Sequence, residues 1–252
     1  LLKQHALSYI YLRRFPEALR KLDQVLNITP DDVGILALQA AIAQAQGDLP
    51  RAAALLTQPR STADDFNALE LRIYQATLER KPAQMIPRIK EELAKADPAL
   101  GFRTGELRFK LGWLQELTGD HVAAQESWRQ ARSELDSFLR EQPENWQLIN
   151  LLAEANMGLG DKATAFSLLQ RAMAAMPIKK DALDGPVVIE TFAEAAARLG
   201  EPDRAIAALR KVISLPSRNL TPLTPALLRL DPRWDPLRSD PRFQELCKDK
   251  QP

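Results

Sequence analysis

Cysteine is nearly absent from this sequence, whose 252 residues include only Cys247. A lone cysteine excludes a disulfide within the chain and a zinc site built on thiolates. It does not decide between an oxidising and a reducing compartment. Of the two, we favour the cytoplasm over the periplasm. Any apolar run close to the roughly 18 residues of a membrane span is also missing. The chain opens on Leu1, already in helical register, which predicts a piece of a longer polypeptide.

An excess of either charge is missing too, since 34 lysines and arginines face 33 aspartates and glutamates. A chain so balanced has no long-range field to draw it to nucleic acid or to an anionic membrane. The basic edge at Arg13, Arg14, Arg20 and Lys21 is short and lacks the interleaved aromatic side chains of a single-strand binding surface. We therefore expect no nucleic-acid partner.

No stretch alternates apolar and polar residues as a β-strand does. Small residues instead recur in pairs twelve positions apart, and the first two pairs are themselves 34 residues apart. The pairs are Ala6 and Ala18, Ala40 and Ala52, Ala153 and Ala165, and Ala193 and Ala205. A period of 34 indicates stacked helix pairs, in which a small side chain lets the second helix approach the first. The sequence therefore predicts an all-α protein.

This period divides residues 1–216 into about six helix pairs. Their expected bounds are about 1–32, 33–64, 65–98, 105–143, 146–177 and 186–216. The third pair is degenerate, with Tyr74 at the position of the small residue. In the fourth, Pro143 comes about seven residues late, so its second helix should be two turns longer than the others.

Glycine is also scarce, with ten residues, and four of them precede an acidic residue at the expected turn within a pair. These four are Gly47, Gly119, Gly160 and Gly200. A glycine ends the first helix in a left-handed turn, and the acidic side chain then caps the second helix.

After Leu215 the prolines recur at short intervals, which excludes a long helix. Thr224-Pro225 and Asp240-Pro241 are helix start signals and predict short helices at 226–230 and 242–247. The terminal unit of a helical stack needs a cover for its apolar face. We expect residues 217–252 to form this C-terminal cap. The apolar side chains available to it are Leu227, Leu228, Leu230, Trp234, Leu237, Phe243 and Leu246.

Over roughly residues 1–215 the units resemble the tetratricopeptide repeat family, whose consensus has the same small residues, turn glycine and final proline. The resemblance implies a right-handed α-solenoid that binds proteins. A narrower resemblance covers residues 223–243, which are similar to the segment that closes the repeat arrays of multidomain bacterial regulators. In those proteins the array follows a protein kinase, an adenylate cyclase or a winged-helix domain, and none of their motifs is present here.

In such arrays the first helices of successive pairs line a concave groove. Projecting each unit in the same way predicts groove residues at Gln75, Phe109, Trp113, Asn150, Glu154, Glu190 and Glu194. The three glutamates could hold a basic segment by charge-assisted hydrogen bonds, or could be ordinary solvated carboxylates. Phe109 and Trp113 could anchor an apolar side chain, or could belong to the core, where we also place Trp128 and Trp146.

We expect no catalytic residue, no metal and no cofactor. His5 and His121 have no partner ligand at metal-binding spacing, and Cys247 has no histidine nearby. The function that we expect is a scaffold that binds a protein or peptide in the groove, as the C-terminal module of a larger bacterial regulatory protein. The alternative is the regulatory half of a signalling kinase or cyclase, with a groove that docks its own catalytic domain or a second copy.

Overall fold

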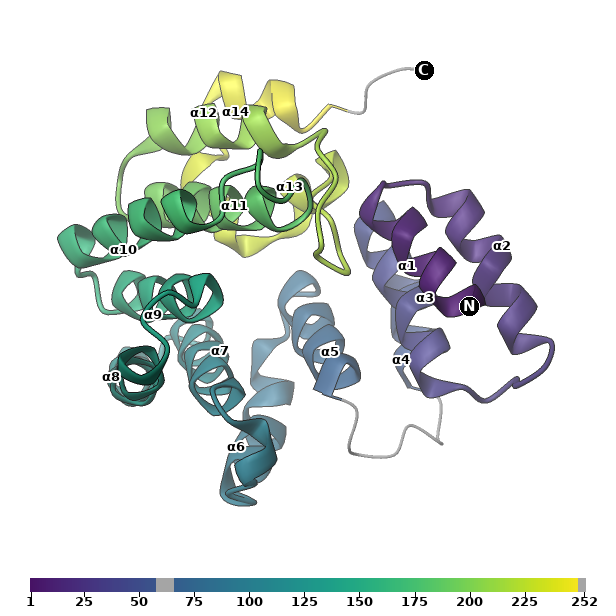
Figure 1. Ribbon diagram of the computed structural model, residues 1–252, viewed down its shortest axis with the longest axis horizontal. Helices are drawn as coiled ribbons and strands as arrows, with labels where there is room; N and C mark the ends of the chain where they lie inside the picture. The colour runs from purple at the N-terminus through teal and green to yellow at the C-terminus, as the bar shows by residue number, and fades with distance from the viewer. Residues whose placement is uncertain (58–65, 249–252) are drawn as a thin grey trace. The chain divides into compact units, whose positions relative to one another are not determined.

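The computed structural model describes residues 1–57 and 66–248 (Figure 1). Every regular element in these residues is a helix, which confirms the all-α prediction. The end of the expected second pair and the last four residues of the expected cap lie outside the described residues. The chain divides into two compact units. Unit 1 comprises residues 1–80, 182–187 and 210–252, and unit 2 comprises residues 81–181 and 188–209.

Unit 1 is built from two helix pairs, a single helix and the C-terminal segment. Its helices are α1 (Leu2–Tyr11), α2 (Phe15–Leu26), α3 (Val33–Gln46), α4 (Leu49–Leu56), α5 (Phe66–Leu78), α13 (Pro225–Leu230), the 3-10 helix η3 (Pro232–Leu237) and α14 (Pro241–Leu246). α1 packs on α2 and α3 on α4, and α3 also packs on α2 and α5. The helices follow one another as the 34-residue period predicts.

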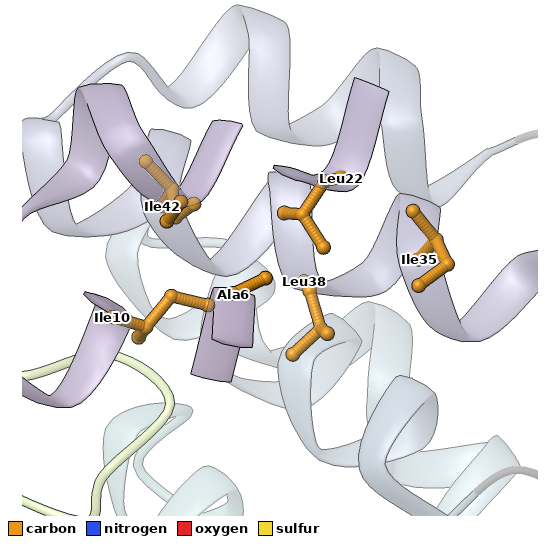
Figure 2. Packing of buried hydrophobic residues seen from close by; sticks show 7 residues of the cluster. Ala6, Ile10, Leu22, Ile35, Leu38 and Ile42 are labelled. Atoms are coloured by element: carbon orange, nitrogen blue, oxygen red, sulfur yellow. The ribbon is translucent and has the colours of Figure 1, made fainter. Parts of the chain in front are cut away.

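A buried apolar cluster holds the first three helices of unit 1 together (Figure 2). Ile10 from α1, Leu22 from α2 and Ile42 from α3 are fully buried and point toward one another. Burying a side chain of this size stabilises the fold by about 1.5–3 kcal/mol. Ala6 and Ala18 lie in the same cluster, where their small side chains allow α1 and α2 to pack closely.

Unit 2 also consists of helix pairs. Its helices are the 3-10 helix η1 (Pro82–Met85), α6 (Ile86–Ala94), the 3-10 helix η2 (Pro98–Leu100), α7 (Arg103–Leu117), α8 (His121–Glu141), α9 (Trp146–Gly158), α10 (Lys162–Ala175) and the larger parts of α11 (Asp184–Arg198) and α12 (Pro202–Val212). α7 packs on α8, α8 on α9, and α9 on α10. The boundary between the units at Arg80 falls inside the degenerate third repeat.

The recurring alanines lie where the period predicts. All eight members of the four pairs are fully buried, from Ala6 and Ala18 in unit 1 to Ala193 and Ala205 in unit 2. Each pair joins the first and the second helix of one repeat. The period of small residues therefore marks close helix packing, because a larger side chain at these positions would force the helices apart.

The turns within the pairs also follow the prediction. Gly47, Gly119, Gly160 and Gly200 have φ between 77° and 84°, in the left-handed region that favours glycine. The aspartates after the first three accept the backbone N–H of the residue three positions on, at 3.1–3.2 Å. Each of the turns at Gly47, Gly119 and Gly160 thus stops one helix and caps the next.

The late Pro143 has the expected effect on the fourth pair. Helix α8 has 21 residues, against 14 in α10, so the difference is two turns. The extra length places Leu135 and Leu139 of α8 among the buried residues of unit 2.

The two short helices predicted near the C-terminus are present. Thr224 accepts the N–H of Leu227 at 3.2 Å to begin α13, and Asp240 accepts the N–H of Arg242 at 2.8 Å to begin α14. The helix η3 between them was not predicted. Leu227 of α13 packs with Ala45 of α3 and Leu78 of α5. This segment therefore contacts the helices at the other end of the sequence.

Candidate functional site

The predicted groove residues fall in both units. Gln75 belongs to unit 1, on α5, and is buried. Its amide accepts a hydrogen bond from Gln44 Nε2 of α3 at 3.0 Å and donates to the carbonyl of Leu49 at the start of α4 at 3.0 Å. Gln44 Nε2 also donates to the carbonyl of Leu71 at 2.9 Å. These two glutamines therefore join α3, α4 and α5 through polar bonds in the interior.

The other predicted residues belong to unit 2, and the polar ones lie on α9 and α11. Asn145 caps α9 by accepting the N–H of Gln147 at 3.1 Å. With Ile149 and Ala153 of α9 fully buried, Asn150 and Glu154 share an adjacent face, one turn apart. Asn150 Nδ2 donates to Glu154 Oε1 at 3.4 Å. This bond places the carboxylate of Glu154 beside the amide of Asn150.

Asn150 also connects the two helices. Its Nδ2 donates to Thr191 Oγ1 of α11 at 3.1 Å, and both side chains are buried. Its carbonyl oxygen Oδ1 is buried without a hydrogen-bond partner in the part of the chain that the structure describes. An unsatisfied buried acceptor costs about 1–3 kcal/mol. This oxygen is therefore an acceptor that a hydrogen-bond donor would stabilise.

Glu190 and Glu194 lie on α11, on either side of Thr191 in sequence and one turn apart from each other. They are 8% and 7% exposed, so they are not the solvated surface carboxylates that we considered as the alternative. Arg198 follows one turn after Glu194, which gives this face of α11 the order acid, acid, base. The positive charge of Arg198 offsets part of the repulsion between the two carboxylates.

Arg198 sits between two indole rings. Its Cζ lies 4.9 Å from the ring centroid of Trp113 on α7 and 4.9 Å from that of Trp128 on α8. It also pairs with Glu116 of α7 at 3.8 Å. Burial lowers the pKa of Arg198, while Glu116 and Glu194 act in the opposite direction. The guanidinium thus ties α11 to α7 and α8 through cation–π contacts.

The aromatic pair on α7 has two different environments. Phe109 is buried, and its carbonyl accepts a hydrogen bond from Trp128 Nε1 at 3.2 Å. Trp113 is half-buried and carries Arg198 over its ring. Trp128 is fully buried, as predicted, whereas Trp146 at the start of α9 is half-buried. Tryptophan therefore fills the interior between α7 and α8, where Gly112 provides the space.

Within the described residues, no three His, Cys, Asp or Glu side chains are grouped so that they could hold a metal ion. His121 begins α8 and lies exposed, as expected, with its Nδ1 2.8 Å from Glu116 Oε2. Burial raises the pKa of the Cys247 thiol, which lowers the fraction of reactive thiolate at neutral pH. None of the helices in the described residues is both long and apolar enough to cross a membrane.

Sequence reasoning missed Arg198 and Thr191. Arg198 stands four residues after Glu194, and that spacing on a helix already signals an ion pair. Its position between Trp113 and Trp128 joins segments 70–85 residues apart in sequence, and no local pattern contains that information. Thr191 has a weaker signal still, because threonine is common on many helix faces.

Stacked helix pairs with polar side chains gathered on successive first helices define a helical-repeat protein. A family model, described as tetratricopeptide repeat, matches residues 3–64 and 117–177. The chain therefore belongs to the tetratricopeptide repeat proteins, which confirms the family resemblance. Such repeats are modules for protein–protein interaction, so the chain is an interaction scaffold with protein partners. No curated protein matches the chain.

Proposed function

We propose that the chain binds a basic peptide or protein segment through an acidic face made of Asn150, Glu154, Glu190 and Glu194, and that this face is the concave surface of the array. The observation that carries the proposal is that Asn150 joins Glu154, which is partly exposed, to Thr191, the residue of α11 that lies between Glu190 and Glu194 in sequence. An arginine or lysine donates hydrogen bonds and has a positive charge, which matches the carboxylates.

The remaining predicted groove residues are engaged in contacts within the protein. The amide of Gln75 is engaged in hydrogen bonds among α3, α4 and α5, and Phe109 is buried beside Trp128. Trp113 supports the acidic face through Arg198, which carries its charge one turn from Glu194. A ligand at the acidic face therefore meets a surface whose geometry is held by α7 and α8.

The experiment is to measure the binding of a set of defined basic, neutral and acidic peptides by calorimetry. The double variant Glu154→Lys, Glu190→Lys should weaken binding of a basic peptide by more than about tenfold, since each charged hydrogen bond contributes about 1.5–3 kcal/mol. The matched control is Glu126→Lys, Glu144→Lys, which makes the same charge change at exposed positions of unit 2.

The control double variant should bind the basic peptide within about twofold of the unsubstituted chain, because exposed charges are screened by salt. Equal weakening in both double variants would reduce the effect to net charge and contradict a defined acidic face. A preference for acidic or neutral peptides would contradict the proposal as well. Helical melting curves of all three proteins would report whether the substitutions disturb the fold.

We further propose that this scaffold works within a larger bacterial regulatory protein. The support is the similarity of residues 223–243 to the closing segment of the arrays in multidomain regulators. In the alternative, in which the chain regulates a kinase or cyclase, the acidic face would dock that catalytic domain or a second copy. The coding sequence around this segment tests the proposal: an adjacent output domain would support it, and an export signal directly before the repeats would contradict it.

A further inference from the structure

Of the three turns that end α1, α3 and α5, two have an arginine where the repeat pattern has glycine. Arg13 stands 34 residues before Gly47, and Arg80 stands 33 residues after it. All three residues have left-handed backbone, with φ of 60°, 80° and 59°. An arginine in this conformation is strained, because its Cβ approaches the following carbonyl oxygen. A side-chain contact that glycine could not make would explain its presence.

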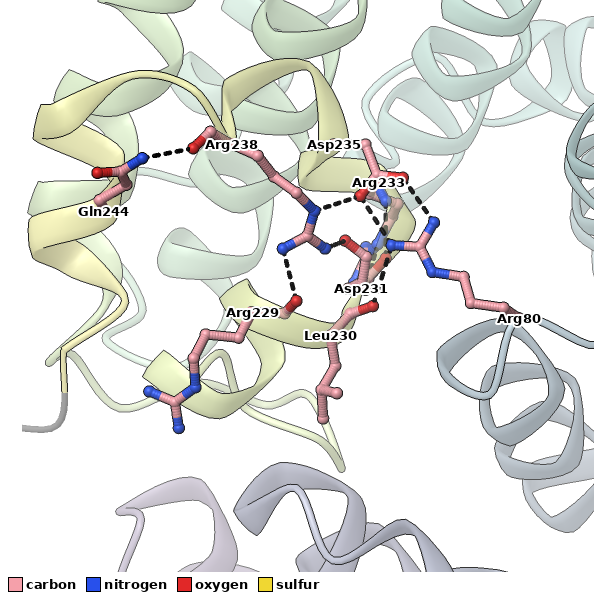
Figure 3. A network of polar contacts seen from close by, with 8 residues as sticks. All are labelled: Arg80, Arg229, Leu230, Asp231, Arg233, Asp235, Arg238 and Gln244. Atoms are coloured by element: carbon pink, nitrogen blue, oxygen red, sulfur yellow. Dashed lines mark hydrogen bonds and ion pairs between the residues drawn. The ribbon is translucent and has the colours of Figure 1, made fainter.

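Both arginines contact the C-terminal segment. Arg13 Nε donates to the carbonyl of Leu215 at 3.0 Å, and its Nη1 donates to the carbonyl of Leu223. Arg80 holds the carboxylate of Asp235 with two nitrogens, at 2.5 and 2.8 Å (Figure 3). These bonds cross about 150 to 210 positions of sequence. The guanidinium groups therefore link the turns to a distant part of the chain.

The middle turn has a glycine, and there the segment approaches the backbone itself. A Cβ added at Gly47 would lie 3.1 Å from the Cβ of Ala226 in α13. Thr224 Oγ1 donates to the carbonyl of Ala45 at 2.6 Å. A side chain at residue 47 would press on α13, so the glycine provides both the turn and the space for the segment.

These contacts follow the order of the sequence. Residues 215 and 223 meet the first turn, residues 224 and 226 the second, and residue 235 the third. At the third turn the buried carboxylate of Asp231 also accepts a hydrogen bond from Tyr74 Oη of α5 at 2.8 Å. Residues 213–237, which we name the strap, thus run along the turns from the first helix pair to α5.

We propose that the strap locks the first two helix pairs and α5 into one cooperative unit, with Arg13 and Arg80 as its anchors. A helical-repeat array without such a crossing segment is stabilised only by contacts between neighbouring repeats, and it can fray from its ends. The strap adds contacts between residues far apart in sequence. The terminal pair α1 and α2 then opens only when the strap is released.

The test uses the full chain and depends on whether substitution by glycine slows or accelerates amide hydrogen exchange. Replacing a strained left-handed residue by glycine relieves strain, so Ala96→Gly, at an exposed turn in unit 2 with φ of 49°, should slow local amide exchange or leave it unchanged. Arg13→Gly and Arg80→Gly should do the opposite. We expect amide exchange to become about tenfold faster, both in α13 and in α1–α3.

A second substitution separates the side chain from the turn. Asparagine also tolerates left-handed backbone, so Arg80→Asn should accelerate exchange as much as Arg80→Gly does. Slower or unchanged exchange in the two arginine-to-glycine variants would overturn the proposal, because the arginines would then be ordinary turn residues. Faster exchange in α13 alone, with α1–α3 unaffected, would overturn it too, since the segment would be an appended tail.

Discussion

Gly112 of α7 lies against the indole of Trp128 in α8: a Cβ added at residue 112 would be 2.5 Å from Trp128 Nε1. A Cβ at Gly158 of α9 would come equally close to the same ring. The tryptophan thus fills the space between α7 and α9, at a point where this chain has Gly112 and four other repeats have alanine.

The substitution Gly112→Ala should therefore destabilise the protein although alanine favours helices. Overpacking of this kind costs about 1–3 kcal/mol, which exceeds the roughly 1 kcal/mol gained in helix propensity. Chemical denaturation measures the change. The double variant Gly112→Ala, Trp128→Phe should lose less stability than the sum of the single variants, because the smaller ring makes room for the methyl group. Strict additivity would contradict a direct contact.

Arg198 should control the environment of both tryptophans that it contacts. Arg198→Lys keeps the charge but loses the planar group that lies over the two rings, so unfolding should become easier by about 1 kcal/mol. Tryptophan emission should shift in the folded protein. The control is Arg204→Lys, because Arg204 lies over the rings of Phe166 and Phe192 and contacts no tryptophan ring that the structure describes. This variant should leave the tryptophan emission unchanged. Equal emission spectra for all three proteins would contradict the stacked arrangement.

The ion pair between Arg80 and Asp235 should make unit 1 less stable in acid. Burial alone would raise the pKa of Asp235, but hydrogen bonds from Arg80 and Arg238 hold it below its ordinary value. A carboxylate with a lowered pKa stabilises the folded state above about pH 4, and this stability is lost as the pH falls through the folded pKa. Because both side chains are more than one-third exposed, the effect is at most about 1 kcal/mol.

The variant Asp235→Asn tests this pH dependence. Its urea midpoint should decrease less than that of the unsubstituted chain between pH 5 and pH 2. Parallel acid limbs in the two proteins would show that the ion pair contributes nothing to acid sensitivity.

The arrangement of helices was largely predictable from the sequence. The 34-residue period placed the alanines in the interior, the turn glycines marked the left-handed positions, and the late Pro143 explained the length of α8. These signals are local, because each depends on the geometry of one helix or one turn. The helix η3 could not be predicted, because a short segment that contains Pro232 and Pro236 shows no helical periodicity of apolar residues.

The strap and the polar contacts of the acidic face were not predictable to the same degree. Arg13 and Arg80 occupy glycine positions, and that departure from the pattern was a signal, but the carbonyls and the carboxylate that they bind lie far away in sequence. A helical projection predicts Glu190 and Glu194 as candidate ligand residues. It does not predict that they are buried, because burial depends on packing between helices. Contacts between distant segments are what a repeat period cannot encode.

The substitution Asn150→Asp should lower the stability of the free protein and raise its affinity for a basic peptide. The change removes the amide that donates to Glu154 and Thr191, and it puts two carboxylates one turn apart, so the free protein should lose about 1 kcal/mol of stability. A basic peptide should bind more tightly, because the added carboxylate accepts a charged hydrogen bond. Thermal melting and calorimetry measure the two effects. A variant that is both less stable and weaker in binding would contradict the place of residue 150 in the acidic face.

Amide hydrogen exchange with and without a bound basic peptide tests the location of the acidic face most directly. The account predicts that the peptide protects amides of α9 and α11, around Asn150, Glu154, Glu190 and Glu194, and that this protection disappears in the Glu154→Lys, Glu190→Lys variant at the same peptide concentration. Protection confined to other helices, such as α2 or α12, or protection that persists unchanged in the variant, would contradict it.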